Sequence, residues 1–288
     1  MTQPAIPPWR RRAVRETRQF LSPAVRNLAR ELGVDASSLL GRGTGGRVTL
    51  DDVRTAARGV PDASRDEVVP FGNIRRRTAV ALLGSKRTAA HALAVTAADY
   101  SGVERARHAA RLTALPFVAR AVVDALREYP LMNATTSPDG ASVTVHRAVH
   151  LGIAVDLDFR GLVVPVVHDA DGLRLRALAA EIRDVASRAR ARTLGPDDLA
   201  GGTFTITNPG ASGTWISFPI INSPQVGIIS TDGVAKQVVV DREGGLAIAP
   251  IGHLCCSFDH RAVDGAYAGS FLERVREIVE TRDWSAEL

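Results

Sequence analysis

The chain has 288 residues, 45% of them hydrophobic and 23% charged, which is enough to bury one large domain and a smaller one. It contains no apolar run near the roughly 18 to 20 residues of a membrane-spanning helix and no hydrophobic signal core, so we expect a cytoplasmic protein without membrane contact. Its two adjacent cysteines, Cys255 and Cys256, fit neither a disulfide framework nor a zinc site. We therefore expect no metal and predict that both cysteines are small buried residues.

The formal net charge is +5, and nearly all basic residues are arginine, with lysine only at Lys86 and Lys236. The planar guanidinium suits ordered pairing with carboxylates and phosphates, whereas a nucleic-acid-binding tail more often contains lysine runs. An acidic protein partner or a phosphate-bearing cofactor is thus favoured, and no nucleic acid is expected. Residues 1–19, with the cluster Trp9-Arg10-Arg11-Arg12, have the composition of a flexible basic tail.

The first predicted element is a short helix that begins at Ser22-Pro23. Serine is a good N-cap and proline fits the first helical position, and Gly33 ends the helix. After the glycine-rich loop 41–46, Thr49 is predicted to cap a second helix. The loop lacks the preceding strand and the lysine of a phosphate-binding loop. Its glycines can equally serve to let a very small domain fold tightly.

The segments that characterise this small domain are Ser22–Ala29, Gly41–Val48 and Asp51-Asp52-Val53. With them, residues 20–58 closely resemble the peripheral subunit-binding domain of 2-oxo-acid dehydrogenase acyltransferases. The resemblance implies that the domain holds a thiamine-dependent decarboxylase or a dihydrolipoamide dehydrogenase. It also implies that Arg26 and Arg47 pair with acidic residues of that partner.

Residues 59–69 are polar and contain proline, as expected of a linker, and residues 70–288 have the pattern of one α/β domain. Predicted strands lie at 149–155, 162–167, 204–207 and 254–258. Apolar residues at helical spacing predict helices around 178–189 and 271–279.

His260 follows the last predicted strand and precedes a helix, within the segment Ser257–Ala266. An imidazole can accept and return a proton near neutral pH, although a lone histidine is more often structural. Here the full pattern His-Arg-x-x-x-Asp-Gly matches the active-site signature of the dihydrolipoamide acyltransferases. The resemblance covers about residues 70–284. It includes Gly161–Val167, Gly201–Asn208 and Pro219–Asn222 in the order of the family.

This resemblance implies a chloramphenicol-acetyltransferase-like α/β fold and assigns three catalytic residues. His260 is the general base that deprotonates a thiol, and Thr207 donates a hydrogen bond to the oxyanion where many relatives have serine. The other interpretation of Thr207 is a β-branched residue favoured in a strand. Asp264 is expected to fix the loop, with Arg261 as its neighbour, while Asp259 and Gly265 are structural.

The substrates implied are coenzyme A and a lipoyl group. Neither Lys86 nor Lys236 lies in the hairpin turn of a lipoyl domain, so a separate lipoyl or carrier protein is expected to supply that group in trans. The resemblance also implies a homotrimer whose histidine and hydroxyl come from adjacent subunits. A larger cage would be weakly held, because Leu288 is the only apolar terminal residue and lies beside Glu287. The segment 91–115 departs from the family pattern, so the acyl group is not implied.

Two alternatives stay open. One is an acyltransferase of the same fold that moves an acyl group from coenzyme A or a carrier to an amine or alcohol in another pathway. The other is a trimeric scaffold that has lost activity, against which the intact His260 and Asp264 argue.

Overall fold

The computed structural model describes residues 21–59, 67–241 and 243–288, which fall into two compact units, 1–70 and 71–288. The expected tail, 1–19, and residues 60–66 of the expected linker lie outside the described residues. Within the described ranges, no helix is long and apolar enough to cross a membrane.

The small unit contains α1 (Pro23–Glu31), α2 (Leu50–Gly59) and two short 3₁₀ turns between them, η2 (Ala36–Ser38) and η3 (Thr44–Gly46). Its core consists of five buried side chains: Val25, Ala29, Ala36, Val48 and Val53. A Cβ on Gly41 would lie 2.2 Å from the carbonyl carbon of Arg47. This glycine therefore allows two backbone segments to meet, which agrees with a role in tight folding.

Both predicted helix caps of the small unit are confirmed. The Ser22 hydroxyl accepts from the Val25 amide at 3.3 Å. Thr49 and Asp52 cap α2 reciprocally, because the Thr49 hydroxyl accepts from the Asp52 amide at 3.2 Å and the Asp52 carboxylate accepts from the Thr49 amide at 2.9 Å. Hydrogen bonds from the Thr49 amide and from Arg42 lower the pKa of Asp52.

The large unit is a mixed sheet with helices on both faces. Its elements in chain order are α3 (Asn73–Thr88), β1 (His91–Asp99), α4 (Ser101–Ala110), α5 (Leu115–Glu128), η5 (Pro130–Met132), β2 (Ala134–Thr136), β3 (Val143–Val145), β4 (Leu151–Ile153), β5 (Val155–Asp156), β6 (Leu162–Val163), β7 (Val166–Val167), η6 (Ala170–Gly172), α6 (Leu175–Ala191), η7 (Asp197–Leu199), β8 (Phe204–Thr207), η8 (Pro209–Ser212), β9 (Gly227–Thr231), β10 (Ala235–Val240), β11 (Leu246–Asp259), α7 (Gly265–Thr281) and η9 (Trp284–Glu287).

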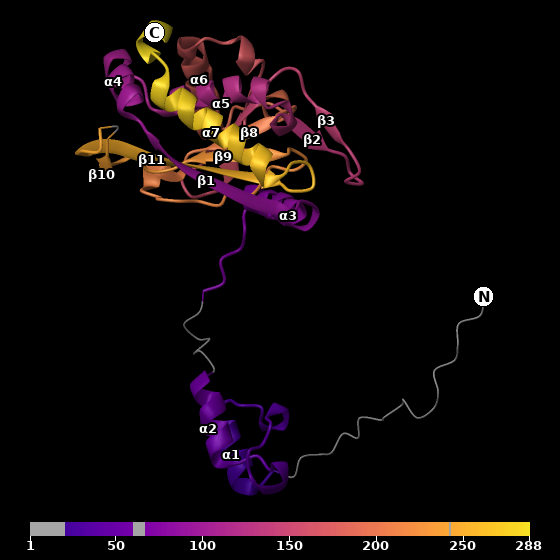
Figure 1. Ribbon diagram of the computed structural model, residues 1–288. Coiled ribbons are helices and arrows are strands. Elements are labelled where there is room, and N and C mark those ends of the chain that lie inside the picture. The colour runs from indigo at the N-terminus through magenta and orange to yellow at the C-terminus, as the bar shows by residue number, and fades with distance from the viewer. Residues whose placement is uncertain (1–20, 60–66, 242) are drawn as a thin grey trace, which may run out of the picture. The chain divides into compact units, whose positions relative to one another are not determined.

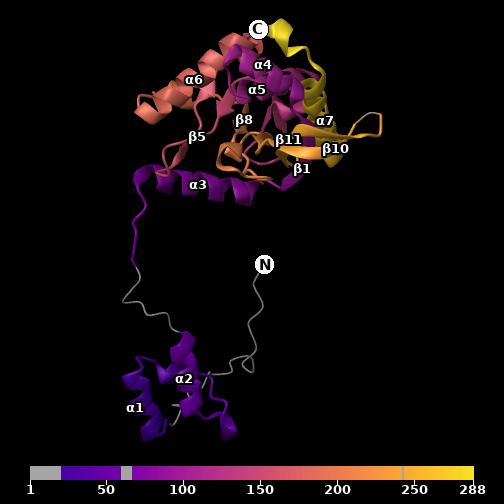
Figure 2. The same ribbon diagram turned by 90° about the vertical axis from the view of Figure 1, so that its left-hand side faces the viewer.

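The sheet has the order β1-β11-β9-β8-β4-β7, with β10 paired to β11. Figures 1 and 2 show α4 to α7 gathered over one face of the sheet and α3 along the other. The helix α5 is apolar nearly all round and buried along most of its length, as a core helix must be. Aromatic contacts join the layer of helices to the sheet and to η9. The ring centroids of Phe204 and Phe271 are 5.7 Å apart, and those of Phe117 and Trp284 are 5.3 Å apart.

Two predicted strands differ from the structure. The apolar run 162–167 forms two short strands, β6 paired with β5 and β7 paired with β4. Pro165 lies between them and has no N–H to donate to a ladder, so the run cannot continue as one strand. The run 149–155 is likewise divided between β4 and β5.

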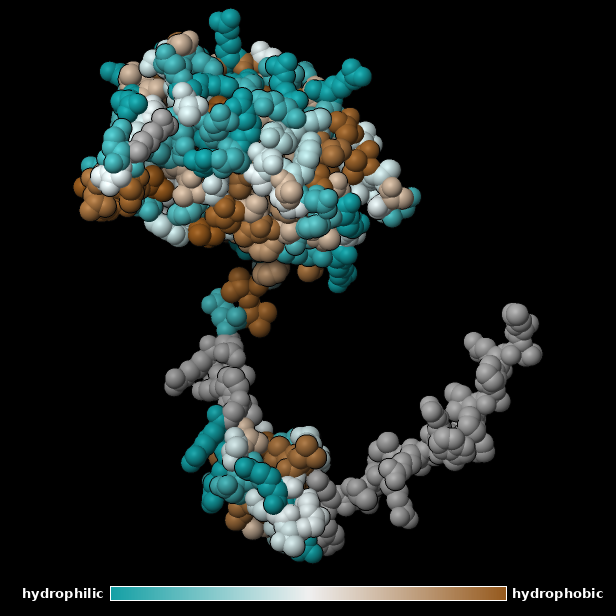
Figure 3. Space-filling view, in the orientation of Figure 1, coloured by the Kyte–Doolittle hydropathy of each residue, from teal (hydrophilic) through white to brown (hydrophobic). Residues whose placement is uncertain are grey.

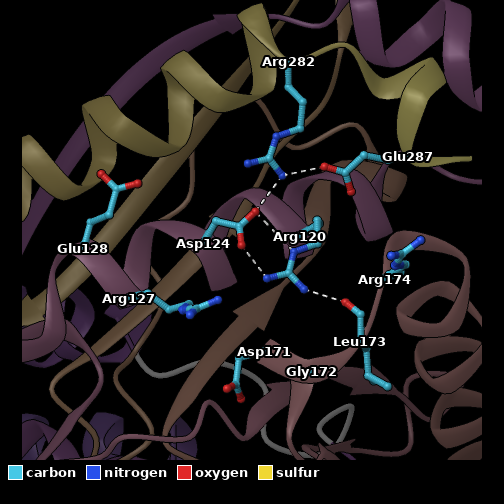
Figure 4. Close-up of a pocket in the computed structure, with 10 residues that line it drawn as sticks. All are labelled: Arg120, Asp124, Arg127, Glu128, Asp171, Gly172, Leu173, Arg174, Arg282 and Glu287. Atoms are coloured by element: carbon cyan, nitrogen blue, oxygen red, sulfur yellow. Dashed lines mark hydrogen bonds and ion pairs between the residues drawn. The ribbon is translucent and has the colours of Figure 1, made fainter.

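A charged pocket of about 490 Å³ lies between α5, η6 and the end of α7 (Figure 4). Arg120 is buried and pairs with Asp124 at 2.5 Å, and it also donates to the carbonyl of Leu173 at 2.6 Å. Arg282 donates to Asp124 at 2.6 Å and to Glu287 at 3.0 Å. The network thus ties α5 to α7 and gives Glu287 a cationic partner.

Candidate active site

His260 lies immediately after β11 with its side chain exposed. Its amide donates to the Ala90 carbonyl at 2.9 Å, and its ring centroid is 5.7 Å from that of Phe258. The carboxylate of Asp259 accepts from the Ala90 amide at 3.1 Å on the same side of the turn. The backbone at His260 is therefore fixed to the neighbouring strand β1, while the imidazole stays accessible.

Arg261, expected as the neighbour of Asp264, does not pair with it. Arg261 instead pairs with Asp259, which is 1% exposed, at 2.6 Å. Burial would raise the pKa of Asp259, but the hydrogen bonds from Arg261 and Ala90 outweigh it and lower the pKa. A buried carboxylate needs a cation beside it, and the guanidinium of Arg261 supplies that cation to Asp259. Asp259 is thus the structural residue of the motif.

Asp264 occupies the N-cap position of α7 and is exposed. Its side chain makes no capping hydrogen bond, and it forms no ion pair with any residue that the structure describes. A negative charge is favourable at a helix N-terminus without such contacts. The carboxylate consequently stays available to a group from outside this chain.

Thr207 is the last residue of β8 and lines an apolar pocket of about 300 Å³. The pocket is formed by side chains from α3, from the β4 to β6 region and from residues 209–222. Within the described part of the chain, the Thr207 hydroxyl has no hydrogen-bond partner. It can therefore donate to a group that enters the pocket.

A buried polar cluster lies beside Thr207, because Ser230 is its register partner on β9. The Ser217 hydroxyl donates to Ser230 at 2.7 Å, and Ser230 donates to Asp232 at 3.2 Å. The Cys255 thiol also donates to Asp232, at 3.0 Å. No local sequence pattern marks this cluster, because its members come from three separate segments.

Both cysteines are fully buried, as predicted. Burial, and then the hydrogen bond to Asp232, raises the pKa of Cys255 to about 11, and burial raises that of Cys256 to about 12. Both are therefore thiols at neutral pH and poor nucleophiles. Among the described residues, no group of three or more His, Cys, Asp or Glu side chains could hold a metal ion.

The strand register places His260 and Thr207 far apart in one chain. Thr207 pairs with Ser230, which pairs with Cys255, whereas His260 lies five residues beyond Cys255 along β11. At about 3.3 Å per residue and about 4.8 Å per strand, the separation is about 15 to 20 Å. A single chain does not bring the two residues together.

Arg26 and Arg47 are both exposed on the small unit. Neither forms an ion pair with a residue in the described ranges, whereas Arg42 is held by Asp52 at 2.7 Å. The two arginines are thus available for contacts outside this unit.

Together the fold and the site define an acyltransferase-type α/β domain that follows a small helical binding domain. Residues 63–285 match the family model of the 2-oxoacid dehydrogenases acyltransferase (catalytic domain), and residues 19–54 match that of the e3 binding domain. The chain belongs to the 2-oxoacid dehydrogenase acyltransferase family. The expected fold class, α/β with a small all-helical subunit-binding domain, is confirmed.

Three of the similar proteins are named for the transfer of different acyl groups. The chain is 36% identical to the dihydrolipoyllysine-residue acetyltransferase component of the pyruvate dehydrogenase complex of Corynebacterium glutamicum, over 93% of this chain and 45% of that protein. It is 36% identical to the lipoamide acyltransferase component of the branched-chain alpha-keto acid dehydrogenase complex of Pseudomonas putida (90% and 66%). It is 35% identical to the succinyltransferase component of the 2-oxoglutarate dehydrogenase complex of Escherichia coli K12 (90% and 70%). The chain spans about half the length of the Corynebacterium and Mycobacterium bovis relatives.

Solved structures agree with this membership. The cubic core of the pyruvate dehydrogenase multienzyme complex is similar with a TM-score of 0.73 and 31% identity, over 77% of this chain and 95% of that chain. The dihydrolipoamide acetyltransferase of Azotobacter vinelandii is similar with a TM-score of 0.72 and 30% identity, over 75% and 92%. That structure comes from work on the role of a serine, a histidine and an asparagine in the catalytic mechanism of that enzyme.

Proposed function

We propose that the protein moves an acyl group between dihydrolipoamide and coenzyme A as the acyltransferase of a 2-oxo-acid dehydrogenase complex. The observation that carries the proposal is the exposed His260, held at the end of β11 within the full His-Arg-x-x-x-Asp-Gly pattern. In the Azotobacter enzyme the histidine and asparagine under study are four residues apart, as are His260 and Asp264. We place Asp264 at the same site, where it orients polar groups rather than relaying a proton.

The reaction needs a base and an oxyanion donor. A thiol is a weak nucleophile at neutral pH, so His260 takes the proton from the attacking thiol. The thiolate adds to the thioester carbonyl, and the oxyanion of the tetrahedral intermediate accepts a hydrogen bond from Thr207. The intermediate then collapses, and the departing thiolate recovers the proton from the imidazolium. Coenzyme A and dihydrolipoamide exchange roles in the reverse direction.

Because His260 and Thr207 lie about 15 to 20 Å apart in one chain by strand geometry, we infer that the site forms between adjacent subunits of a homotrimer. A larger cage is compatible with this unit. The lipoyl group is supplied in trans by a separate lipoyl or carrier protein, since Lys86 lies within α3 and Lys236 within β10. We place the protein in the cytoplasm, where buried thiols such as Cys255 and Cys256 stay reduced.

The test replaces His260 by alanine and measures acyl transfer from acetyl-, isobutyryl- and succinyl-coenzyme A to free dihydrolipoamide. We expect a loss of about two to four orders of magnitude with every donor that the parent uses, because the base is removed. His108→Ala on the exposed face of α4 is the matched control and should retain the parent rate. Activity of His260→Ala within tenfold of the parent would sink the mechanism.

We further propose that residues 20–58 bind a thiamine-dependent decarboxylase or a dihydrolipoamide dehydrogenase through Arg26 and Arg47. Both guanidinium groups are exposed, and charge-assisted pairs with carboxylates are among the strongest polar contacts. In calorimetry of the full chain, the double Arg26→Ala, Arg47→Ala variant should bind at least about tenfold more weakly. The pair Arg105→Ala, Arg183→Ala removes the same charge from the large unit and should not change the affinity. Equal binding by both double variants would remove the claim.

A further inference from the structure

Sequence identity to these relatives does not indicate which acyl group this protein transfers. Relatives named for acetyl, branched-chain and succinyl transfer are 36%, 36% and 35% identical to it. The choice must therefore come from the side chains around the reacting carbonyl, and the pocket that Thr207 lines is the cavity beside that position.

We propose that this pocket holds the acyl chain and selects an uncharged, short branched acyl group over a succinyl group. The inference rests on the proposed function, because it takes Thr207 as the residue that faces the thioester carbonyl. A carbonyl oxygen at the Thr207 hydroxyl places the carbon chain against the other walls of the pocket. Those walls are mainly aliphatic and aromatic, with Leu162, Val164, Ile220 and Ile228 among them.

Two polar side chains in the walls are already engaged, whereas that of Asn222 is exposed, uncharged and without a hydrogen bond to a described residue. The buried Thr205 hydroxyl donates to the side-chain oxygen of Gln225 at 2.6 Å, and the Ser217 hydroxyl donates to Ser230 at 2.7 Å. No charged residue is among the described residues that line the pocket. An acyl chain that ends in a carboxylate would therefore lose its hydration without gaining a cation, which strongly disfavours its binding.

A negative group behind the wall adds to this effect. Asp232 is 2% exposed and lies 3.2 Å from the Ser217 hydroxyl, which lines the pocket. Its Oδ2 accepts from three side chains, Ser217, Ser230 and Cys255, and no cation pairs with it in the part of the chain that the structure describes. A second carboxylate in the pocket would be repelled by the Asp232 carboxylate behind the wall.

The size of the pocket separates a branched acyl group from acetyl. Its volume is about 300 Å³, which is about ten times the roughly 30 Å³ that one water molecule occupies in the liquid. The single methyl of an acetyl group would leave most of the apolar wall without contacts. Each additional methylene that fills an apolar pocket raises specificity by about tenfold or more.

One cation lies close to this region and must be tested. The Lys86 ammonium is 4.6 Å from the ring centroid of Phe218, a residue of the pocket, but Lys86 itself is not among the lining residues. If Lys86 reached into the pocket, it would favour a succinyl carboxylate. Lys86→Ala would then reduce succinyl transfer alone.

The experiment measures kcat/KM for transfer to free dihydrolipoamide from acetyl-, isobutyryl-, isovaleryl- and succinyl-coenzyme A. We expect the two branched donors to exceed acetyl by about tenfold and succinyl by about a hundredfold. An acetyl or succinyl value equal to or above the branched values overturns the pocket inference and leaves the proposed function intact. A folded oligomer that transfers none of the four groups overturns the proposed function, and this inference with it.

A charge placed in the pocket gives an independent test. Leu82→Lys adds a cation to the lining and should raise the succinyl-to-isobutyryl ratio of kcat/KM at least about tenfold. Leu83→Lys is the matched control, since Leu83 is the next residue of α3, is 57% exposed and does not line the pocket. Its ratio should equal that of the parent. Equal ratios in both variants, or a selective loss of succinyl transfer in Lys86→Ala, would contradict the proposal.

Discussion

Thr207 is the last residue of β8, a strand that lies between two parallel partners, β4 and β9, and its hydroxyl lies at an apolar pocket. A strand in the middle of a sheet is among the most rigid positions that a fold offers, so the hydroxyl is placed before substrate arrives. Preorganised donors of this kind are effective because the protein does not need to rearrange during the reaction. A β-branched residue also suits the strand, so the two interpretations of Thr207 make different predictions for substitution.

Thr207→Ser keeps the hydroxyl and should retain most of the activity. Thr207→Val keeps the shape and the strand preference but removes the donor, and we expect kcat to fall by about two orders of magnitude. The measurement is steady-state transfer to dihydrolipoamide with the preferred donor, alongside the thermal unfolding of both variants. If valine performs as well as serine, Thr207 only packs the strand.

At the scale of elements, the ion-pair network of Figure 4 joins helices that are far apart in the sequence. Asp124 on α5 receives hydrogen bonds from Arg120 on the same helix and from Arg282 at the end of α7. Burial would raise the pKa of Asp124, but the two arginines outweigh this and lower it. The carboxylate is thus the common partner of two cations, one of which is buried.

Asp124→Asn should lower the free energy of unfolding by about 2 to 4 kcal/mol at neutral pH, because it leaves the buried Arg120 without its counter-charge. Glu277→Gln, in an exposed pair with Arg274, is the control and should cost less than about 1 kcal/mol. Since the native pKa of Asp124 is lowered, its contribution is complete above the ordinary carboxyl value of about 4 and is lost as the pH falls through the native pKa. Urea unfolding at neutral and acidic pH measures both effects, and a variant as stable as Glu277→Gln would contradict the assignment.

Local signals predicted the elements that have clear caps or clear alternation. Ser22-Pro23 and Thr49 mark helix starts, and 204–207 is β8 with the same bounds. The sequence did not reveal α3, because the helix contains the charged run Arg75-Arg76-Arg77 and its one buried residue, Ser85, is polar. It also could not give the strand order, because the pairing of β8 between β4 and β9 depends on contacts between distant segments.

The candidate site, like the fold, is only partly predicted by local sequence signals. The motif marked His260 as a candidate, but it did not predict the partner of Arg261. That partner is Asp259, the buried carboxylate, and the sequence pattern does not say whether Asp259 or Asp264 points inward. The polar cluster around Asp232 and the pocket that Thr207 lines are each assembled from several segments of the chain, so no local sequence pattern marks them. Spacing in the chain carries information about a site only where its residues share one element or one turn.

At the scale of the whole molecule, part of the arginine-rich composition serves the structure. Many arginines of the large unit are held in ion pairs: Arg107, Arg120, Arg188, Arg261, Arg274, Arg276 and Arg282. For these seven arginines, the pairing with carboxylates that the guanidinium favours is internal to the unit. The exposed Arg26 and Arg47 of the small unit differ from them in this respect.

An apolar strip on the β10–β11 hairpin remains uncovered in one chain. Val238 pairs with Ile248 and Val240 with Leu246, and all four side chains are at least 70% exposed. Figure 3 shows this end of the large unit in brown, where Figure 1 has β10. Contiguous exposed apolar side chains of this kind mark contact surfaces in proteins.

The trimer can be tested through its divided site. In a homotrimer whose sites take His260 from one subunit and Thr207 from the next, mixed trimers of His260→Ala and Thr207→Val chains contain sites with both residues intact. Random assembly in equal amounts gives about one quarter of such sites, so co-expressed chains should recover about a quarter of the parent activity. Light scattering of the same sample should give a mass near three chains. Activity no greater than the average of the two variants measured separately would show that both residues act within one chain, against the separation that the register of β8, β9 and β11 gives them.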